Sequence, residues 1–358
     1  MAVDAGGDRF LRQRALLGFG RPAQERLAAA RIAVIGAGGL GSAVLPVLAG
    51  AGVGAIAIVD DDTVDLANLH RQTLYTAADV GRGKAEAAAV ALARMAPDAE
   101  ITPLAVRFTP DTASLLDDVD LVVDGSDALA TRYLADDAAA ERDIPLVWGS
   151  ALGWAGQVGV AWERYGVGYR DLYPEPADDL AGDTCSTVGV LPSVCTVIGG
   201  LMASEALKLL SGSGDPLLGR AIVYDARRGD LREIAYRREG EPVRRMPAAP
   251  VPHETVSPAE LAALLGTPAG APVLLDVRED EEVARVTLPG ARHIPLGDLE
   301  RRVGELDPDA ATVVYCHLGV RSAHALDVLA AAGFRRARHL AGGIDAYAAQ
   351  VDPALARY

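Results

Sequence analysis

Cys316 is the residue of this sequence that is best suited to nucleophilic chemistry. It follows the apolar run Thr312–Tyr315 and begins the segment Cys316-His-Leu-Gly-Val-Arg-Ser322, which runs into a predicted helix. Successive backbone N–H groups at the start of a helix stabilise an anion, which here would be a thiolate or a persulfide. Arg321 adds a positive charge to the same loop. The sequence therefore predicts a reactive sulfur at Cys316.

The length of this loop separates two kinds of enzyme. Cysteine phosphatases place a longer loop between their cysteine and arginine, which makes room for a phosphate. In this chain only four residues, 317–320, separate Cys316 from Arg321. The smaller loop suits a sulfur atom carried on Cys316 and argues against a phosphatase.

A second chemical signal is the glycine-rich segment Gly36-Ala-Gly-Gly-Leu-Gly41, which follows the apolar run Arg31–Ile35 and opens a predicted helix. Glycines allow a tight turn and let backbone N–H groups approach a phosphate at the helix N-terminus. Asp60 follows the next apolar run, Ala55–Val59, where a carboxylate can bind a ribose hydroxyl. The pattern predicts a nucleotide or dinucleotide site, and alone it leaves a nicotinamide-dependent oxidoreductase open.

The residues after Asp60 favour a triphosphate over a dinucleotide. Polar and basic side chains follow at Asn68, Arg71, Gln72 and Lys84. Arginine and lysine can grip a triphosphate or stabilise the charge on a departing pyrophosphate, which hydride transfer does not need. Asp127, beyond the run Leu121–Asp124, could hold a magnesium ion beside those phosphates. Near the carboxyl ends of strands in one sheet, these residues together predict an ATP site.

The arrangement of apolar runs predicts an α/β fold for the first part of the chain. Strand-like runs lie at 31–35, 55–59, 120–124 and 145–148. Helix-length segments separate them, which implies a parallel sheet with both faces covered. The apolar stretch from about Ser193 to Leu210 is expected to be a helix that is buried or lies at a subunit interface.

A proline-rich stretch then divides the chain. Residues 239–258 contain five prolines and few large apolar side chains, which predicts an extended linker. A smaller α/β pattern follows, with strand-like runs at 272–276 and 312–315 and helices that start near Pro258 and Ser322. We expect a first domain at 1–240, a linker at 241–254 and a second domain at 255–358.

Composition narrows the classes of function. A formal net charge of −15 repels phosphate backbones, so direct nucleic-acid binding is not expected. The three cysteines, Cys185, Cys195 and Cys316, can form neither a disulfide framework nor a four-thiolate zinc site, and free thiols suit a reducing compartment. Residues 1–10 lack the apolar core of a secretory signal, and the uncharged run 32–59 holds seven glycines and a proline, unlike a membrane span. A cytoplasmic protein that does not enter a membrane is expected.

The order of motifs along residues 9–241 resembles the ATP-dependent activating enzymes of sulfur-carrier proteins, which are relatives of the ubiquitin-activating enzymes. The matching segments are Arg9-Phe-Leu-Arg-Gln13, Gly36-Ala-Gly-Gly-Leu-Gly-Ser42, Ala51-Gly-Val-Gly54, Asn68-Leu-His-Arg-Gln72, Gly156-Gln157 and Gly189-Val-Leu191. The resemblance implies a Rossmann-like adenylating domain of the ThiF/MoeB type.

The resemblance also implies a reaction and its residues. ATP would adenylate the C-terminal glycine carboxylate of a small ubiquitin-like carrier protein ending in Gly-Gly, with release of pyrophosphate. Carried over residue by residue, the nucleotide and its magnesium ion would be held by Gly39, Gly41, Asp60, Asp62, Asn68, Arg71, Lys84 and Asp127. Arg71 and Asp127 would also act in catalysis. Arg12 would reach into a partner subunit's site, which implies a homodimer.

Some positions depart from the family's pattern. Ala128 stands where the family often has asparagine. Pro46 lies inside the predicted helix after the glycine loop, where it should cost a backbone hydrogen bond and kink the helix. Residues 168–171 and 241–244 stand where many relatives carry Cys-x-x-Cys pairs for structural zinc, and neither segment has a thiol. No zinc is expected.

Residues 255–358 resemble a single rhodanese domain. Besides the Cys316 loop, the matching segments are Leu275-Asp-Val-Arg278, Gly290-Ala-Arg-His-Ile-Pro295 and Leu340-Ala-Gly-Gly343. The resemblance implies that Cys316 carries a persulfide, loaded by an external donor such as a cysteine desulfurase. Cys185 occupies the place of a loop cysteine that forms a thioester or an acyl disulfide in some relatives and is dispensable in others, so its role stays open. Cys195, in an apolar helix, is expected to pack as a small hydrophobe.

These expectations combine into one enzyme with adenylyltransferase and sulfurtransferase activities. The first domain would adenylate the carrier, and the Cys316 persulfide would then attack the activated carbonyl to give a thiocarboxylate. The linker would let the second domain visit the adenylate. A nicotinamide-dependent oxidoreductase and a non-catalytic module that docks carriers stay open as alternatives. The sequence does not indicate whether the carrier serves molybdenum cofactor, thiamine or cysteine synthesis, or tRNA thiolation.

Overall fold

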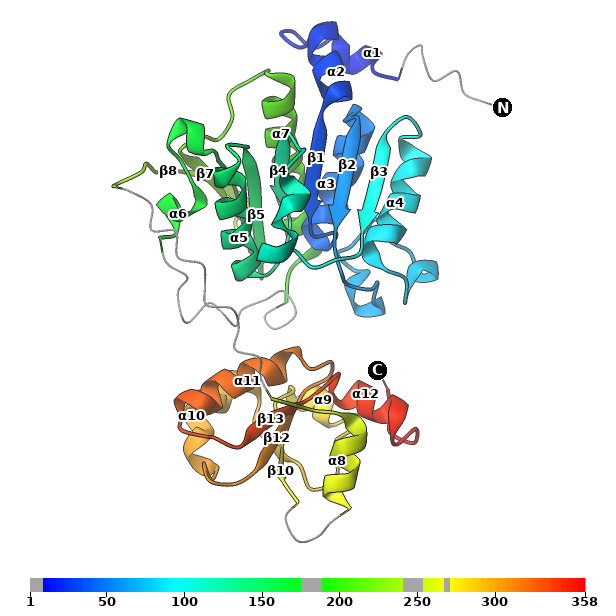
Figure 1. Ribbon diagram of the computed structural model, residues 1–358, viewed down its shortest axis with the longest axis vertical. Helices are drawn as coiled ribbons and strands as arrows, with labels where there is room; N and C mark the ends of the chain where they lie inside the picture. Colours follow the sequence, from blue (N-terminus) through cyan, green and yellow to red (C-terminus); the bar gives the residue numbers. More distant parts are fainter. Residues whose placement is uncertain (1–8, 175–188, 241–253, 267–270, 358) are drawn as a thin grey trace. The chain divides into compact units, whose positions relative to one another are not determined.

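The computed structural model describes residues 9–174, 189–240, 254–266 and 271–357, without the side chains at 281 and 320. The chain divides into two compact units, Met1–Pro247 and Ala248–Tyr358, and the elements of each are labelled in Figure 1. The predicted linker at 241–254 lies outside the described residues except for Glu254.

The first unit is built on an eight-stranded sheet with the order β3-β2-β1-β4-β5-β6-β7-β8. Its strands are β1 Arg31–Ile35, β2 Ala55–Val59, β3 Glu100–Leu104, β4 Leu121–Asp124, β5 Leu146–Leu152, β6 Ala155–Ala161, β7 Arg220–Asp225 and β8 Asp230–Ala235. The strands from β3 to β5 pair in parallel, whereas β6, β7 and β8 pair antiparallel with their neighbours.

The four strands that the sequence predicted, β1, β2, β4 and β5, thus pair in parallel as expected, whereas the antiparallel strands β6, β7 and β8 were not predicted. β5 and β6 are separated only by Gly153 and Trp154, and Gly153 has a φ of +57°. A connection this short reverses the chain and cannot hold the crossover helix that a parallel pair needs. The turn between β7 and β8 is also short and contains Gly229 at a φ of +68°.

Helices cover both faces of this sheet. They are α1 Leu11–Arg14, α2 Gly20–Ala29, α3 Gly39–Ala51, α4 Lys84–Met95, α5 Leu129–Glu141, α6 Tyr169–Leu172 and α7 Pro192–Ser211. One core lies between the sheet and α3, α4 and α7, and the other lies under α5 and α6. Because helices cover both faces of the sheet, the residues of its parallel strands β1, β2 and β4 are nearly all apolar.

Helix α7 is long and apolar enough to cross a membrane by length and composition alone. It packs against α3, β5 and β6, and Val194, Cys195, Ile198 and Met202 are buried there. Its hydrophobicity is thus used in the core of the first unit, as the sequence predicted for a buried helix.

Helix α3 contains Pro46 and nevertheless continues to Ala51. Proline has no N–H, so the carbonyl of Ser42 lacks its helical donor. The Ser42 hydroxyl donates to the carbonyl of Gly38 at 2.6 Å, which ties the first turn of the helix back to the glycine loop.

The second unit has a five-stranded parallel sheet with the order β11-β10-β12-β13-β9. Its strands are β9 Thr255–Val256, β10 Val273–Asp276, β11 Arg292–His293, β12 Thr312–Tyr315 and β13 Ala337–Leu340. Its helices are α8 Pro258–Leu265, α9 Asp280–Val283, α10 Leu296–Arg302, α11 Val320–Ala331 and α12 Gly343–Gln350.

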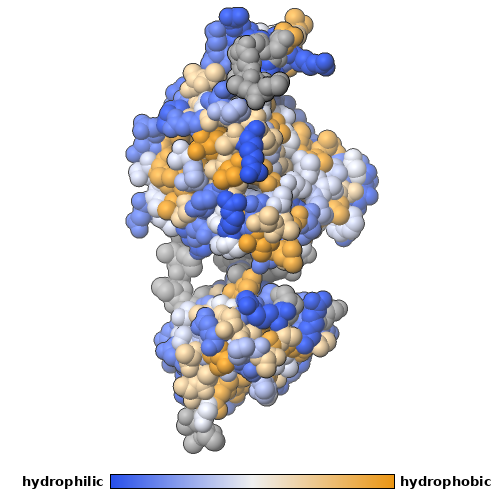
Figure 2. Space-filling view, turned by 90° about the vertical axis from the view of Figure 1, so that its right-hand side faces the viewer, coloured by the Kyte–Doolittle hydropathy of each residue, from blue (hydrophilic) through white to orange (hydrophobic). Residues whose placement is uncertain are grey.

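Alternate residues of the central strands face two cores in this unit. Leu275 and Val314 point to the core under α10 and α11, whereas Leu274 and Val313 point to the core under α8 and α12. Both units are thus α/β, as predicted. On the face drawn in Figure 2, apolar and polar side chains are interspersed.

Candidate functional site

The glycine loop joins β1 to α3 and leaves no space for a side chain at Gly36 or Gly41. Gly36 has a φ of +88°, and a β-carbon there would lie 3.0 Å from the carbonyl carbon of Gly125. A β-carbon on Gly41 would collide with the carbonyl oxygen of Gly36. The loop is therefore bare backbone at the start of a helix, which is an arrangement that binds phosphate.

Asp60 supports this loop from the end of β2. Its Oδ2 accepts the N–H of Ala37 at 2.7 Å, and its Oδ1 accepts the N–H of Asp62 at 2.9 Å. Burial raises the pKa of Asp60, and the nearby positive charge of Lys84 opposes that shift. Each carboxylate oxygen has a further lone pair, so the side chain could still accept a ribose hydroxyl.

Arg71 and Asn68 lie together next to the loop. Arg71 Nη2 donates to Asn68 Oδ1 at 2.9 Å, and Nη1 lies 2.9 Å from His70 Nε2. The Cδ of Arg71 lies 3.7 Å from the position of a β-carbon on Gly39. The hydrogen bond to Asn68, three residues earlier in the chain, thus holds the guanidinium of Arg71 beside the glycine loop.

Lys84 is almost buried at the start of α4. Its Nζ lies 2.8 Å from Asp62 Oδ2, and only 7% of its side chain is exposed. Tyr75 ties the two segments together, because its hydroxyl lies 2.8 Å from the carbonyl oxygen of Ala37 and 3.2 Å from that of Lys84. A fixed lysine beside a bare glycine loop suits the binding of an anionic ligand.

Asp127 lies in the turn between β4 and α5, and its side chain is exposed. Gly125, two residues earlier, contacts the glycine loop at Gly36 and Gly41. The structure therefore brings Gly39, Gly41, Asp60, Asp62, Asn68, Arg71, Lys84 and Asp127 to the same edge of the sheet. Glycine backbone, basic side chains and carboxylates at one edge fit ATP.

The structure does not bring Arg12 to this edge. Its helix α1 is anchored at the far end of α3: Arg9 Nη2 donates to the carbonyl of Ala49, and Gln13 Nε2 donates to that of Ala51. The glycine loop begins the same helix, and thirteen residues of α-helix span roughly 20 Å. Cys185 lies outside the described residues.

In the second unit, Cys316 directly follows β12, and its loop is built around the sulfur. The residue is 1% exposed, and the N–H of Gly319 donates to Sγ at 3.1 Å. Ser322 Oγ lies 3.6 Å from the same sulfur. Gly319 has a φ of +98°, a conformation that glycine adopts without strain, and α11 begins at the next residue. This arrangement stabilises negative charge on sulfur.

Helix α12 holds the other side of this loop. The N–H of Ile344 donates to the carbonyl of Cys316 at 2.9 Å, and that of Asp345 donates to the carbonyl of His317 at 3.2 Å. A β-carbon on Gly343 would collide with both carbonyl groups. Helix α12 thus fixes the carbonyl side of the loop, while the N–H of Gly319 donates to the sulfur.

The guanidinium of Arg321 is directed to a carboxylate. Its Nη1 and Nη2 each lie 2.6 Å from an oxygen of Glu282 in α9. The positive charge that the sequence predicted for the Cys316 loop is thus paired with a carboxylate, whereas the backbone N–H of Gly319 donates to the sulfur. Burial lowers the pKa of His317, which keeps its imidazole neutral near pH 7.

Cys195 and metal sites complete the sequence-based candidates. Cys195 is buried in α7, and burial raises the pKa of its thiol, which agrees with its predicted role as a small hydrophobe. Among the described residues, no three histidine, cysteine, aspartate or glutamate side chains are grouped as a metal site requires.

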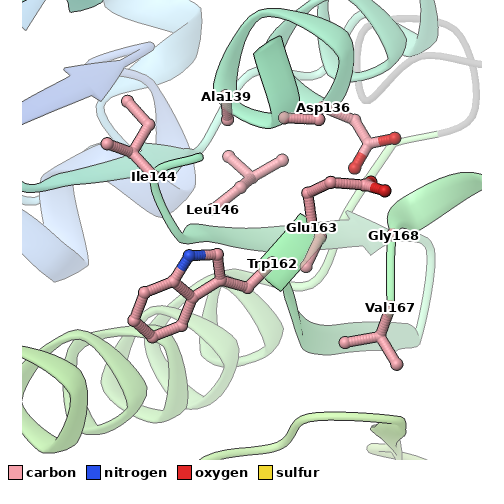
Figure 3. Close-up of a pocket in the computed structure, with 10 residues that line it drawn as sticks. Asp136, Ala139, Ile144, Leu146, Trp162, Glu163, Val167 and Gly168 are labelled. Carbon is pink, nitrogen blue, oxygen red and sulfur yellow. The ribbon is translucent and has the colours of Figure 1, made fainter. Parts of the chain in front are cut away.

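The edge of the sheet that carries the glycine loop, Arg71 and Lys84 is called the nucleotide edge below. Two hollows of the first unit lie away from it. Figure 3 shows the smaller one, beside α5 and the end of β6, with Asp136 and Glu163 at its rim. Both carboxylates are engaged: Asp136 accepts the N–H of Tyr169 at 2.9 Å, and Glu163 pairs with Arg238. The other, of about 490 Å³, is lined by residues that precede β1, β4 and β5, at the opposite edge of the sheet.

Sequence reasoning missed three residues that support the two sites. Asp124 and Arg132 form a buried ion pair beneath the turn that carries Asp127. Glu282 pairs with Arg321 across 39 positions of sequence. Such pairs leave no local pattern, although a charged residue in an otherwise apolar strand, as in β4, is a signal of a buried partner.

Comparison with known protein families divides the chain at the same two units. Residues 10–243 match the ThiF family, and residues 257–350 match the rhodanese-like domain. The match to the ThiF family covers more than half of the chain.

Two of the relatives align with this chain over both of its units, and a third aligns with a smaller part of it. The chain is 40% identical over 98% of its length, and 95% of the relative's, to a probable adenylyltransferase/sulfurtransferase MoeZ of Mycobacterium tuberculosis. It is 35% identical to adenylyltransferase and sulfurtransferase MOCS3 of Bos taurus, with 98% of this chain and 87% of that protein covered. A sulfur carrier protein adenylyltransferase of Thermus thermophilus is 43% identical over 64% of this chain and 88% of its own.

Solved structures show the same fold for the first unit. The Escherichia coli protein MccB, crystallised with MccA-N7isoASN, superposes with a TM-score of 0.56 at 19% identity, and the match covers 66% of this chain and 73% of that one. With the Rossmann-like sheet, the glycine loop and the Cys316 loop in place, the predicted fold class is confirmed. The chain belongs to the ThiF family of adenylating enzymes and carries a rhodanese-like domain after its ThiF domain.

Proposed function

We propose that this protein is an adenylyltransferase and sulfurtransferase that activates a sulfur-carrier protein with ATP and then delivers sulfur to it. The observation that carries the proposal is the presence, in one chain, of a nucleotide edge in the ThiF domain and of a sulfur-holding loop at Cys316. The full-length relatives named as adenylyltransferase and sulfurtransferase support the same pairing. A nicotinamide-dependent oxidoreductase and a docking module are not favoured by these matches.

The first step is the activation of a carboxylate. A carboxylate oxygen of the carrier's C-terminal glycine attacks the α-phosphorus of ATP, and pyrophosphate leaves. The bare backbone at Gly39 and Gly41 suits the phosphates, Asp60 suits the ribose, and Asn68 orients Arg71. Arg71 and Lys84 would stabilise the charge that builds on the departing pyrophosphate. Asp127 would hold a magnesium ion that neutralises phosphate charge.

The second step transfers sulfur. The terminal sulfur of a Cys316 persulfide attacks the adenylated carbonyl carbon, AMP leaves, and an acyl disulfide joins the carrier to Cys316. A thiol then reduces the sulfur–sulfur bond of that acyl disulfide, which releases the carrier thiocarboxylate and forms a disulfide with Cys316. Cys185 is proposed either as that thiol or as an acyl acceptor. Arg321, paired with Glu282, would shape the loop rather than donate to the sulfur.

The proposal includes how the parts of the enzyme cooperate. Residues 1–240 would form the adenylating domain, 241–254 the linker and 255–358 the sulfurtransferase domain. The linker would raise the local concentration of persulfide at the adenylate. Because α1 is anchored far from the glycine loop of its own chain, Arg12 could act only in a second subunit's site, which supports a homodimer. A cytoplasmic location and a persulfide donor such as a cysteine desulfurase complete the scheme.

Two assays of the purified full chain test the proposal. Exchange of pyrophosphate into ATP that depends on a carrier ending in Gly-Gly would support adenylation. Formation of a thiocarboxylate from that carrier, ATP and a persulfide donor, detected as a 16 Da mass increase, would support sulfur delivery. Absence of exchange with every Gly-Gly carrier that the source organism encodes would contradict the proposal. Copurification with such a carrier would identify the pathway.

A further inference from the structure

Two charged side chains lie almost completely buried beneath the turn between β4 and α5. Arg132 Nε donates to Asp124 Oδ2 at 3.0 Å, and the side chains of the two residues are 7% and 0% exposed. Removing two charges from water costs about as much as their attraction returns, so such a pair adds little net stability. The pair is better explained by the part of the chain that it holds in place.

That part is Ser126, whose polar groups are all bound by the pair. Asp124 Oδ1 accepts the N–H of Ser126 at 3.0 Å and its hydroxyl at 2.6 Å. Arg132 Nη2 donates to the carbonyl of Ser126 at 2.8 Å. The carboxylate of Asp124 and the guanidinium of Arg132 therefore make three hydrogen bonds to Ser126 and one to each other.

Asp127 lies between Ser126, which the ion pair holds in place, and the first turn of α5. On its other side, the carbonyl of Ala128 accepts the N–H of Arg132 at 3.2 Å. The side chain of Asp127 is exposed, and within the described part of the chain it makes no ion pair. Its backbone is thus fixed on both sides while its carboxylate stays available at the nucleotide edge.

Arg132 is itself held by aromatic packing. Its guanidinium carbon lies 5.9 Å from the ring centre of Tyr169, and that ring packs edge-on against Trp148 and Tyr133 at 5.1 and 5.2 Å. A cation over an aromatic face is stabilised there. The strand, the helix and the aromatic cluster leave the guanidinium one orientation, which is how a supporting residue keeps a reacting group in place.

We propose that Arg132 is a positioning residue for adenylation, which acts through Ser126 to hold the carboxylate of Asp127 toward the nucleotide. The inference rests on the proposed function, which assigns Asp127 to ATP and its metal ion. It requires arginine in particular, because Nε and Nη2 reach Asp124 and Ser126 at once. Lysine keeps the charge but cannot span both acceptors.

The first test is Arg132→Lys in the full chain. We expect carrier-dependent ATP–pyrophosphate exchange to fall by roughly 10- to 100-fold, the usual effect of losing a group that orients a metal ligand. The magnesium concentration for half-maximal exchange should rise. Sulfur transfer from thiosulfate to cyanide, which needs only the Cys316 unit, should stay at the wild-type rate. Ser126→Ala, which removes only the hydroxyl bond, should shift exchange and magnesium dependence in the same direction by a smaller factor.

The matched control is Arg170→Lys. Arg170 is also buried, and it binds Asp137 through Nε and Nη2 at 3.0 and 2.8 Å, so its ion pair lies outside the 124–128 turn. Thermal unfolding should show a similar loss of stability for both lysine variants. Folded Arg170→Lys enzyme should keep the wild-type exchange rate and magnesium dependence.

The outcomes separate the inference from the proposed function. Equal kinetics in the two lysine variants would mean that Arg132 serves only the fold and would overturn the inference. If Arg132→Lys does not fold, an unchanged magnesium dependence in Ser126→Ala overturns it instead. A wild-type enzyme without exchange activity contradicts the proposed function. In that case calorimetry of Mg-ATP binding decides the inference, which requires weaker binding by Arg132→Lys than by Arg170→Lys.

Discussion

The sulfur of Cys195 lies 2.9 Å from the position that a β-carbon on Gly39 would occupy. The cysteine belongs to α7 and the glycine to the first turn of α3, so α7 packs directly against the glycine loop. The conformation of this loop therefore depends on the size of a side chain from another helix.

The first prediction follows from this contact. Gly39→Ala should destabilise the first unit by about 1–3 kcal/mol and weaken ATP binding, because the new methyl group collides with sulfur. Cys195→Ala removes the sulfur, and the double variant should recover most of both losses. Gly50→Ala in the same helix, where nothing lies within 4 Å, is the control. Thermal unfolding and calorimetry measure the effects, and a double variant no better than Gly39→Ala would contradict the explanation.

The second prediction separates the two half-reactions. Cys316→Ser should abolish thiocarboxylate formation while pyrophosphate exchange continues at the wild-type rate, because the two sites lie in separate units. Serine keeps the shape of the loop but is a far weaker nucleophile than a thiolate. Mass spectrometry of the carrier and radiolabel exchange measure the two activities. Thiocarboxylate formed at the wild-type rate would exclude Cys316 as the sulfur donor.

The third prediction concerns the charge near the sulfur. Glu282→Gln removes one negative charge that is paired with the guanidinium of Arg321, so the net charge beside Cys316 becomes more positive. A nearby positive charge stabilises a thiolate. Alkylation of Cys316 by iodoacetamide should then be faster than in the wild type at the same pH. Glu305→Gln, which breaks a pair with Arg302 elsewhere in the unit, should leave the alkylation rate unchanged.

The fourth prediction uses His317, whose pKa burial lowers from its ordinary value of 6.5. Below pH 6.5 the unfolded chain binds a proton that the folded protein excludes, so stability falls as the pH falls through this range. His317→Gln should lose that part of the pH dependence, whereas His324→Gln on α11 should retain it. Denaturant unfolding of the full chain between pH 5 and 8 is the measurement. Equal slopes in the two variants would show that His317 does not titrate on unfolding.

The central strands could be predicted from the sequence because burial on both faces makes them continuous apolar runs. β1, β2 and β12 occupy the predicted residues. β8 could not be found in this way, because its residues are mostly exposed and its pairing depends on a short turn. β9 and β11 have only two residues each, which is too short for any pattern.

The same distinction holds for the sites. The glycine loop, Asn68 and Arg71 lie close together in sequence, so their chemistry is visible in a motif. Arg132 and Glu282 act through partners on other elements, and only the fold shows that they meet. The sequence predicted a positive charge in the Cys316 loop but could not show that Glu282 pairs with it.

The hold of α12 on the carbonyls of Cys316 and His317 has a consequence for protein synthesis. The ribosome makes the sulfur-bearing loop before it makes Gly343 and Ile344, whose helix orients that loop. A nascent chain that stops short of α12 would carry the cysteine without the geometry that stabilises its thiolate. The carbonyls of this loop therefore gain these hydrogen-bond donors only after α12 has been translated.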